Sequence, residues 1–383
     1  MLLTTLIAAA LGWALYKVRQ QGIAVAALKQ IDCTFMCDMT PRSPTVLERL
    51  RKLLGEHEPL TVTGVISRSP NFTDAGIMLI RGWTQLRVLI LQESQVTDAG
   101  LVHLQGLTQL EGLDLSGTKV TGAALAHLQG LSQLKWLRLG ETQLTDADLV
   151  HLRGLTQLRF LSLQKSQLTD AGLVHLQGLS QLQRLDLTGT QVTDAGLVHL
   201  KALTQLHELN LGGTKVTGAG LVHLQGLAQL QSLYLFETQL TDAGLVHLGG
   251  LTQLTILGLG ATPLTNAGLV ELAGLTRLNT LVLDNTKVTG AGLAHLQGLA
   301  QLECIFLCKT QTDDDGLTGV AGLITLRQLD LTGTRVTDAG LVHLQGLTKL
   351  GVLDLARTQV TDAGVRQLQK ALPKCYVNLE PFD

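Results

Sequence analysis

Aromatic residues are scarce in this chain, at 3% of 383 residues, and the formal net charge is only −2. A nucleic-acid-binding surface would need a basic stripe, so this composition argues against such a partner. The five cysteines form no disulfide framework, and four of them make two CxxxC pairs, Cys33/Cys37 and Cys304/Cys308. In a strand, residues four apart lie roughly 13 Å from each other, too far to share a metal ion or a disulfide. We therefore expect no metal, no cofactor and no nucleic-acid partner.

Catalytic motifs are lacking as well. The sequence contains no G-x-S-x-G, no H-E-x-x-H and no phosphate-binding loop. Its Thr, Asp and His residues recur as interchangeable copies, whereas catalysis needs one convergent set of side chains. The sequence therefore predicts a protein that is not an enzyme.

What the chain does contain is a 24-residue unit, typified by residues 182–205, LQRLDLTGTQVTDAGLVHLKALTQ. Twelve units follow one another without insertion, and they open at Leu86, Leu110, Leu134, Leu158, Leu182, Leu206, Leu230, Leu254, Leu278, Leu302, Leu326 and Leu350. A fixed period of this length is typical of a solenoid, in which each repeat buries its apolar face against its neighbours.

Each unit, numbered 1 to 24 from its opening leucine, predicts a strand, a turn, a short helix and a segment that leads back to the next strand. Leucines at positions 1, 4 and 6 suit a strand with one buried face. Thr at position 12 and Asp at position 13 predict the N-cap of a two-turn helix, and Gly at position 21 predicts a left-handed C-cap. Strands stack about 4.7–4.9 Å apart, whereas helices are roughly 10 Å wide, so the strand side should be concave.

The pattern LxxLxLxxTxVTDAGLxxLxxL resembles a leucine-rich repeat, and it covers the chain from Val62 to the C-terminus. It resembles the helix-bearing repeats of ribonuclease-inhibitor and F-box proteins more than the shorter repeats of internalins. The resemblance implies an α/β fold: a right-handed, curved solenoid with a concave parallel sheet and short convex helices. It also implies protein–protein interaction as the usual role. Most of the family has Asn at position 9, where this chain has Thr or Ser, so we expect a ladder of hydroxyl groups there.

The N-terminal region lies outside the repeat. Residues 1–16 carry no charged side chain and Lys17 and Arg19 follow, so we expect a membrane anchor over 1–21. The positive-inside rule would then keep the repeats cytoplasmic. A signal peptide, which would make the protein secreted, and a packed helix are the alternatives.

The rest of the chain divides into a cap and a solenoid. Residues 22–61 should form the N-terminal cap, with a strand at 33–37, a loop at 39–43 and a helix at 44–54. Residues 62–373 should form the solenoid, although the first copy, 62–85, is degenerate. Residues 374–383 should supply a capping strand and tail.

The candidate binding residues occupy positions 3, 5 and 7, which point away from the core on the strand side. They are Trp136, Arg138, Phe160, Arg184, Asp186, Glu208, Asn210, Tyr234 and Phe236. All five aromatics between positions 86 and 373 fall on this variable face, where no core demands them, and aromatics with Arg are typical anchors of protein interfaces. The alternative is harmless drift at exposed positions.

Position 18 carries histidine in nine of the twelve units, from His103 to His343. A metal-binding or proton-sensing column is one interpretation. A surface residue copied by duplication is the other, and we favour it because the histidines lie on the convex side.

These observations predict a membrane-tethered, non-catalytic scaffold that binds a protein or peptide on its concave face. One alternative is the substrate-recognition subunit of a ubiquitin-ligase-like assembly, although nothing in 22–61 resembles an F-box. The other is a protein inhibitor of an enzyme, although the many cysteines and strong acidity of ribonuclease inhibitor are lacking.

Overall fold

The computed structural model describes residues 16, 19–37 and 62–380, and the chain divides into two compact units. The first unit is Met1–Ser162 and the second is Leu163–Asp383. Both are built from the 24-residue repeat, with one short strand and one short helical segment in each copy.

The strands of the first unit follow one another in chain order. β1 pairs antiparallel with β2, and the pairs from β2 to β6 are parallel. The bounds are β1 Thr34–Cys37, β2 Val62–Ile66, β3 Val88–Ile90, β4 Gly112–Asp114, β5 Trp136–Arg138 and β6 Phe160–Ser162. The predicted strand at 33–37 is confirmed as β1.

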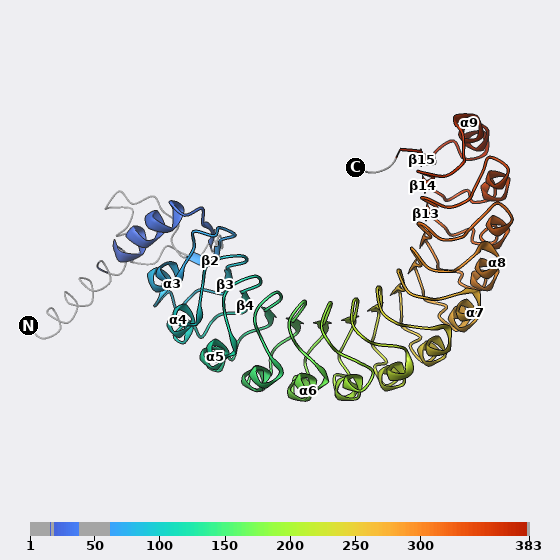
Figure 1. Cartoon of the computed structure of the whole chain (residues 1–383). Coiled ribbons are helices and arrows are strands. Elements are labelled where there is room, and N and C mark those ends of the chain that lie inside the picture. Colours follow the sequence, from blue (N-terminus) through green and yellow to red (C-terminus); the bar gives the residue numbers. More distant parts are fainter. Residues whose placement is uncertain (1–15, 17–18, 38–61, 381–383) are drawn as a thin grey trace, which may run out of the picture. The chain divides into compact units, whose positions relative to one another are not determined.

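The second unit continues the same pattern with strands that pair in parallel, each with the next. Their bounds are β7 Arg184–Asp186, β8 Glu208–Asn210, β9 Ser232–Tyr234, β10 Ile256–Gly258, β11 Thr280–Val282, β12 Cys304–Phe306, β13 Gln328–Asp330, β14 Val352–Asp354 and β15 Tyr376–Asn378. Within this unit the strands line the concave side and the helices the convex side (Figure 1). The parallel sheet and the convex helices are as the repeat predicts.

The core of both units is made of the repeated leucines. In the copy that opens at Leu182, the side chains of Leu182, Leu187, Leu197 and Leu200 are fully buried, and the equivalent residues of other copies are buried as well. Partners in neighbouring parallel strands are residues of the same unit position, such as Leu209 opposite Leu233. The 24-residue period therefore sets the register of the sheet.

The helical segments differ from the predicted two-turn α-helices. Many are a single α-turn followed by 3₁₀ helix, and others are 3₁₀ helix throughout. The reason is the leucine spacing: positions 16, 19 and 22 are three residues apart, which matches the 3.0 residues per turn of a 3₁₀ helix. In the first unit they are α3 Asp74–Ile80, α4 Asp98–Leu101 with η1 Val102–Leu104, α5 Gly122–Leu125 with η2 Ala126–Leu128, and η3 Asp146–Leu152.

In the second unit only the last helix is long. The segments are α6 Asp170–Leu173 with η4 Val174–Leu176, η5 Gly196–Ala202, η6 Ala219–Leu224, η7 Asp242–Leu248, α7 Asn266–Leu269 with η8 Val270–Gly274, α8 Gly290–Leu293 with η9 Ala294–Leu296, η10 Asp315–Gly319, η11 Gly340–Leu344 and α9 Asp362–Ala371. The predicted N-cap is confirmed at several of them. Thr97, for example, accepts a hydrogen bond from the amide of Ala99 at 3.3 Å.

The left-handed residue of the repeat is at position 8, so the predicted left-handed Gly at position 21 is wrong. All twelve residues at position 8 have a φ between +51° and +69°, and eight of them are not glycine. The helical segment ends differently, because its last turn closes by a hydrogen bond from position 22 to position 19, as from the Leu203 amide to the Leu200 carbonyl at 2.9 Å. The sharp turn of the repeat therefore follows the strand.

The hydroxyl ladder predicted at position 9 is also wrong. From Thr118 to Thr358 these hydroxyls donate to the carbonyl at position 6 of their own repeat, as Thr190 does to Leu187 at 2.7 Å, whereas the buried hydroxyl of Ser94 finds no partner among the described residues. A regular set of side-chain bonds between repeats comes from position 13 instead. Asp98 accepts from the amide of Thr121 at 2.7 Å and from its hydroxyl at 2.6 Å. Equivalent bonds join Asp74 to Thr97, Asp170 to Thr193, Asp242 to Thr265, Asp314 to Thr337 and Asp338 to Thr361.

Most of the N-terminal predictions lie outside the described residues. Of the predicted anchor at 1–21, the structure describes Tyr16 and residues 19–21, which are helical, and the helix continues to residue 29. The predicted loop at 39–43 and helix at 44–54 are not among the described residues. Within residues 16, 19–37 and 62–380, none of the helices combines the length and the apolar character that crossing a membrane requires.

Candidate binding surface

The nine candidate residues project from the sheet on the surface formed by positions 3, 5 and 7, which we call the strand face. In β5, Trp136 is half-buried and Arg138 exposed, whereas Leu137 between them is fully buried. Trp136, Arg138 and Phe160 belong to the first unit, and the other six belong to the second. All nine therefore lie where the sequence predicts, and that they bind a partner stays a prediction.

In the first unit, three of these residues form one packed cluster around a guanidinium group. The Cζ atom of Arg138 lies 5.2 Å from the centre of the Phe160 ring and 5.9 Å from that of Trp136. One guanidinium nitrogen is 3.5 Å from Oδ2 of Asp114, whose side chain is only 3% exposed. Cation–π contact and an ion pair thus fix the Arg138 side chain in one orientation. Sequence reasoning found the three large residues but missed Asp114.

The aromatic rings lie across glycines of neighbouring strands. A side chain at Gly112 would overlap the indole of Trp136, and one at Gly212 would overlap the ring of Phe236. Each pair shares a unit position, because adjacent strands are in register. The sequence carries this signal, since the glycine stands 24 residues before the aromatic residue.

Four polar candidates in the second unit are engaged locally. Arg184 Nε lies 3.5 Å from Glu208 Oε2, with both side chains well exposed, so this pair contributes little stability. Asp186 accepts from the amide of Thr188 at 3.0 Å, and Asn210 accepts from the amide of Gly212 at 3.0 Å. Asp and Asn at position 5 therefore stabilise the turn that follows the strand.

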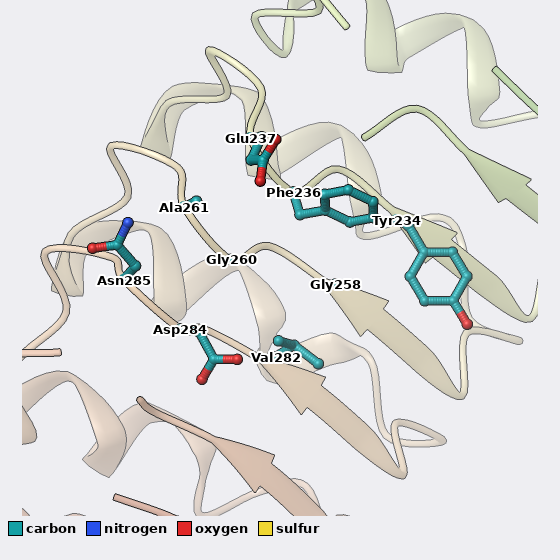
Figure 2. A pocket seen from close by; sticks show the side chains of 9 residues that line it. All are labelled: Tyr234, Phe236, Glu237, Gly258, Gly260, Ala261, Val282, Asp284 and Asn285. Atoms are coloured by element: carbon teal, nitrogen blue, oxygen red, sulfur yellow. The ribbon is translucent and has the colours of Figure 1, made fainter. Parts of the chain in front are cut away.

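Tyr234 and Phe236 form one wall of a pocket of about 300 Å³ on the strand face of the second unit (Figure 2). Gly258, at the end of β10, and Gly260, in the turn that follows, contribute backbone to the floor of the pocket, and the ring of Tyr234 lies against Gly258. Val282 and Asp284 form the opposite side. The full lining is Tyr234, Phe236, Glu237, Gly258, Gly260, Ala261, Val282, Asp284 and Asn285. Sequence reasoning found the aromatic wall and missed the glycine floor and the acidic side.

The ionisable side chains that line this pocket are acidic. Burial raises the pKa of the Asp284 carboxyl, and the charge of Asp330 raises it further, against a hydrogen bond from the Cys308 amide at 2.7 Å that lowers it. Burial also raises the pKa of the Tyr234 phenol, with a contribution from Glu208. In the part of the chain that the structure describes, no Lys, Arg or His lies within ion-pair distance of Asp284.

The histidine column lies on the convex side, and His127, His151 and His199 are each bonded to a glutamine of the preceding repeat. Nδ1 of His127 is 2.8 Å from the side-chain nitrogen Nε2 of Gln105, and Nδ1 of His199 is 2.8 Å from Nε2 of Gln177. Among the described residues, no group of three or more His, Cys, Asp or Glu side chains is placed to hold a metal ion. The geometry gives these imidazoles a contact with the preceding repeat.

Two segments of the chain, residues 179–201 and 322–344, match the family model described as Leucine Rich repeat. A search of curated proteins found no match.

Solved structures share the fold. An internalin of Listeria monocytogenes is 24% identical, with 80% of this chain and 93% of that one covered and a TM-score of 0.58. A leucine-rich repeat protein of Leptospira interrogans is 19% identical, with coverages of 80% and 88% and a TM-score of 0.52. The plant peptide hormone receptor RGFR1 in complex with RGF2 is 16% identical, with coverages of 79% and 52% and a TM-score of 0.50. These structures show that the chain shares the fold of leucine-rich repeat proteins, and two of its copies match the family model directly.

Proposed function

We propose that this protein is a non-catalytic scaffold that binds a protein or a peptide across its strand face. Leucine-rich repeat proteins are typically interaction scaffolds, and one of the similar structures is a receptor solved in complex with RGF2. The observation that carries the proposal is the placement of the large side chains. Trp136, Phe160, Tyr234 and Phe236 all stand on the strand face, outside the leucine core.

The Arg138 cluster adds a physical reason. A side chain that is already held in one rotamer loses little conformational entropy when a partner binds, so its contacts contribute more to affinity. Arg138 is held in this way by Trp136, Phe160 and Asp114, while about half of its side chain remains exposed. Aromatic residues and Arg are also the types that dominate binding energy at protein interfaces.

The experiment compares crosslinked partners of the wild-type chain with those of a Trp136→Ala, Phe160→Ala, Tyr234→Ala variant in native membranes. The matched control is a Val174→Ala, Val222→Ala, Val246→Ala variant, because these valines are 37–53% exposed and lie in the helical segments of the convex side. Circular dichroism establishes that both variants fold. Partners lost in the first variant and kept in the second support binding on the strand face. Partners kept in both contradict it.

We further propose that residues 1–21 attach the protein to a membrane with the repeats on the cytoplasmic side. The proposal rests on the uncharged run of residues 1–16 and the basic residues that follow it. Carbonate extraction of membranes tests attachment, and protease protection of sealed vesicles tests the side. Release of the chain by carbonate would contradict membrane attachment. Protection of the repeats from protease inside right-side-out secretory vesicles would contradict their cytoplasmic location.

A further inference from the structure

We propose that the pocket between Tyr234 and Asp284 is a specificity site that takes the cationic side chain, Arg or Lys, of an extended segment of the partner. This inference rests on the proposed function, because it names the chemistry that the strand face recognises. It is carried by the shape of the pocket, by its charge and by an intramolecular counterpart in the first unit.

The shape suits one long side chain. Adjacent parallel strands lie about 4.7–4.9 Å apart, so β9 and β11 are separated by roughly 10 Å across β10. The floor runs from Gly258 to Gly260, which is roughly 6.6 Å along a strand and comparable to the aliphatic stem of Lys or Arg. Figure 2 shows the rings of Tyr234 and Phe236 on one side of this floor and Asp284 on the other.

The charge of the pocket has one sign. Glu237 and Asp284 line it, and its lining contains no basic residue. Oδ1 of Asp284 accepts a hydrogen bond from the Cys308 amide, while Oδ2 accepts none from the described residues. A half-buried carboxylate with an open oxygen and no counter-ion is stabilised by a cation that enters beside it. Basic residues of the nearby repeats, such as Lys309, stand at exposed corners after their strands and outside the lining.

The first unit contains the filled version of this arrangement. There, the guanidinium of Arg138 lies near two aromatic rings and forms an ion pair with the carboxylate of Asp114. The pocket of the second unit offers two aromatic rings and a carboxylate in the same chemistry, without the basic side chain. Because aromatic faces attract Arg and Lys, and carboxylates bind their charged ends, an external cation completes the set.

The test starts from a random twelve-residue peptide library displayed on phage and selected on the full-length chain. The tightest peptides are then synthesised with each Arg replaced by citrulline, which has nearly the same shape and no charge, and each Lys replaced by norleucine. We expect one basic residue to be essential, with at least a tenfold loss of affinity upon its replacement. The same peptides should bind at least tenfold more weakly to an Asp284→Asn, Glu237→Gln variant.

The control variant is Glu271→Gln, which removes a negative charge from an exposed position of the convex side. It should leave the affinity unchanged, and this result separates the pocket from the overall charge of the protein. An effect of the same size in the control variant would overturn the inference.

Failure of the inference and failure of the proposed function have different signatures. Peptides whose binding needs the strand-face aromatics but tolerates citrulline, norleucine and the pocket variant overturn the inference alone. If the library yields no binder, or only binders that are indifferent to every strand-face substitution, the proposed function falls and the inference with it. A glycan array that binds the chain through Tyr234 while no peptide does would overturn both in favour of a sugar ligand.

Discussion

Replacing Asp242 by alanine should loosen the contact between two neighbouring repeats of the second unit. Asp242 accepts from the amide of Thr265 at 2.9 Å and from its hydroxyl at 2.6 Å, across the boundary between consecutive copies. Thr265 is in turn the N-cap of α7 and accepts from the amide of Ala267 at 3.3 Å. The substitution therefore removes two charge-assisted hydrogen bonds and releases the residue that begins the next helix.

The expected cost follows from the exposure of these groups. Hydrogen bonds to a charged group contribute about 1.5–3 kcal/mol each when buried. Both residues are half-buried, so water replaces part of the interaction and the low end of the range applies. We expect Asp242→Ala to lower the free energy of unfolding by about 2–3 kcal/mol.

The chain itself offers two matched controls. Asn266 occupies position 13 in the next copy, and it bonds the amide of Thr289 at 2.8 Å and its hydroxyl at 2.7 Å. Asp242→Asn should therefore keep both bonds and cost less than about 1 kcal/mol. Asp362, in the first turn of α9, stands at position 13 of the copy that opens at Leu350 and accepts no such pair of bonds from the described residues, so Asp362→Ala reports only the charge at a helix N-terminus, about 0.3–1 kcal/mol.

Native-state hydrogen exchange at the Thr265 amide is the most direct assay, and urea unfolding gives the global effect. Because repeats couple to their nearest neighbours, exchange should rise most in the copies on either side of Asp242. Unchanged exchange at Thr265 in Asp242→Ala would refute the reasoning. An Asp242→Asn variant as unstable as Asp242→Ala would show that charge, and not bonding geometry, stabilises this boundary.

Four further substitutions test other parts of the structure. Gly213 and Ala261 both occupy the left-handed position 8, and a side chain at Gly213 would meet nothing closer than 3.5 Å, so Gly213→Ala should cost about 1–2 kcal/mol in urea unfolding and Ala261→Gly should cost nothing or stabilise. Hydrogen bonds lower the pKa of Asp338, so its contribution to stability is present above about pH 4 and is lost as the pH falls through its folded-state value; the stability difference between wild type and Asp338→Ala should shrink over that window. Arg138→Met should leave the buried Asp114 without its ion pair, lowering the free energy of unfolding in urea by roughly 1 kcal/mol.

The features that sequence reasoning predicted are those set by burial within one repeat. Leucines at fixed spacing identify the core, and their period of two in residues such as Leu185 and Leu187 identifies the strand, because one side of a strand faces the core. The parallel order follows, since every copy presents the same residues to the next. None of these predictions needs knowledge of how two copies touch.

The features that sequence reasoning missed depend on contacts between neighbouring copies of the repeat. Asp at position 13 is read from the sequence as a helix-terminal charge, and only the register of adjacent copies shows that it binds the next threonine. The same register explains Gly122 at that position, which sequence analysis leaves unexplained: a side chain there would overlap Asp148 of the following repeat. Asp148 accepts from the amide of Thr145 of its own repeat at 2.8 Å. In other copies the equivalent threonine amide donates to the Asp at position 13 of the preceding repeat.

In the candidate site too, the sequence shows the large side chains, whereas only the structure shows what they contact. Large side chains such as Trp136 and Phe236 are visible in the sequence, but the structure gives each of them a structural task, because each covers a glycine of the preceding strand. Their placement is therefore weaker evidence for binding than the sequence suggests. The pocket adds evidence that does not depend on the aromatic residues alone, because its lining joins Tyr234 and Phe236 to the backbone of Gly258 and Gly260 and to Asp284. Between Tyr234 and Asp284, whose Oδ2 accepts no hydrogen bond from the described residues, the pocket retains a place for a side chain from outside the protein.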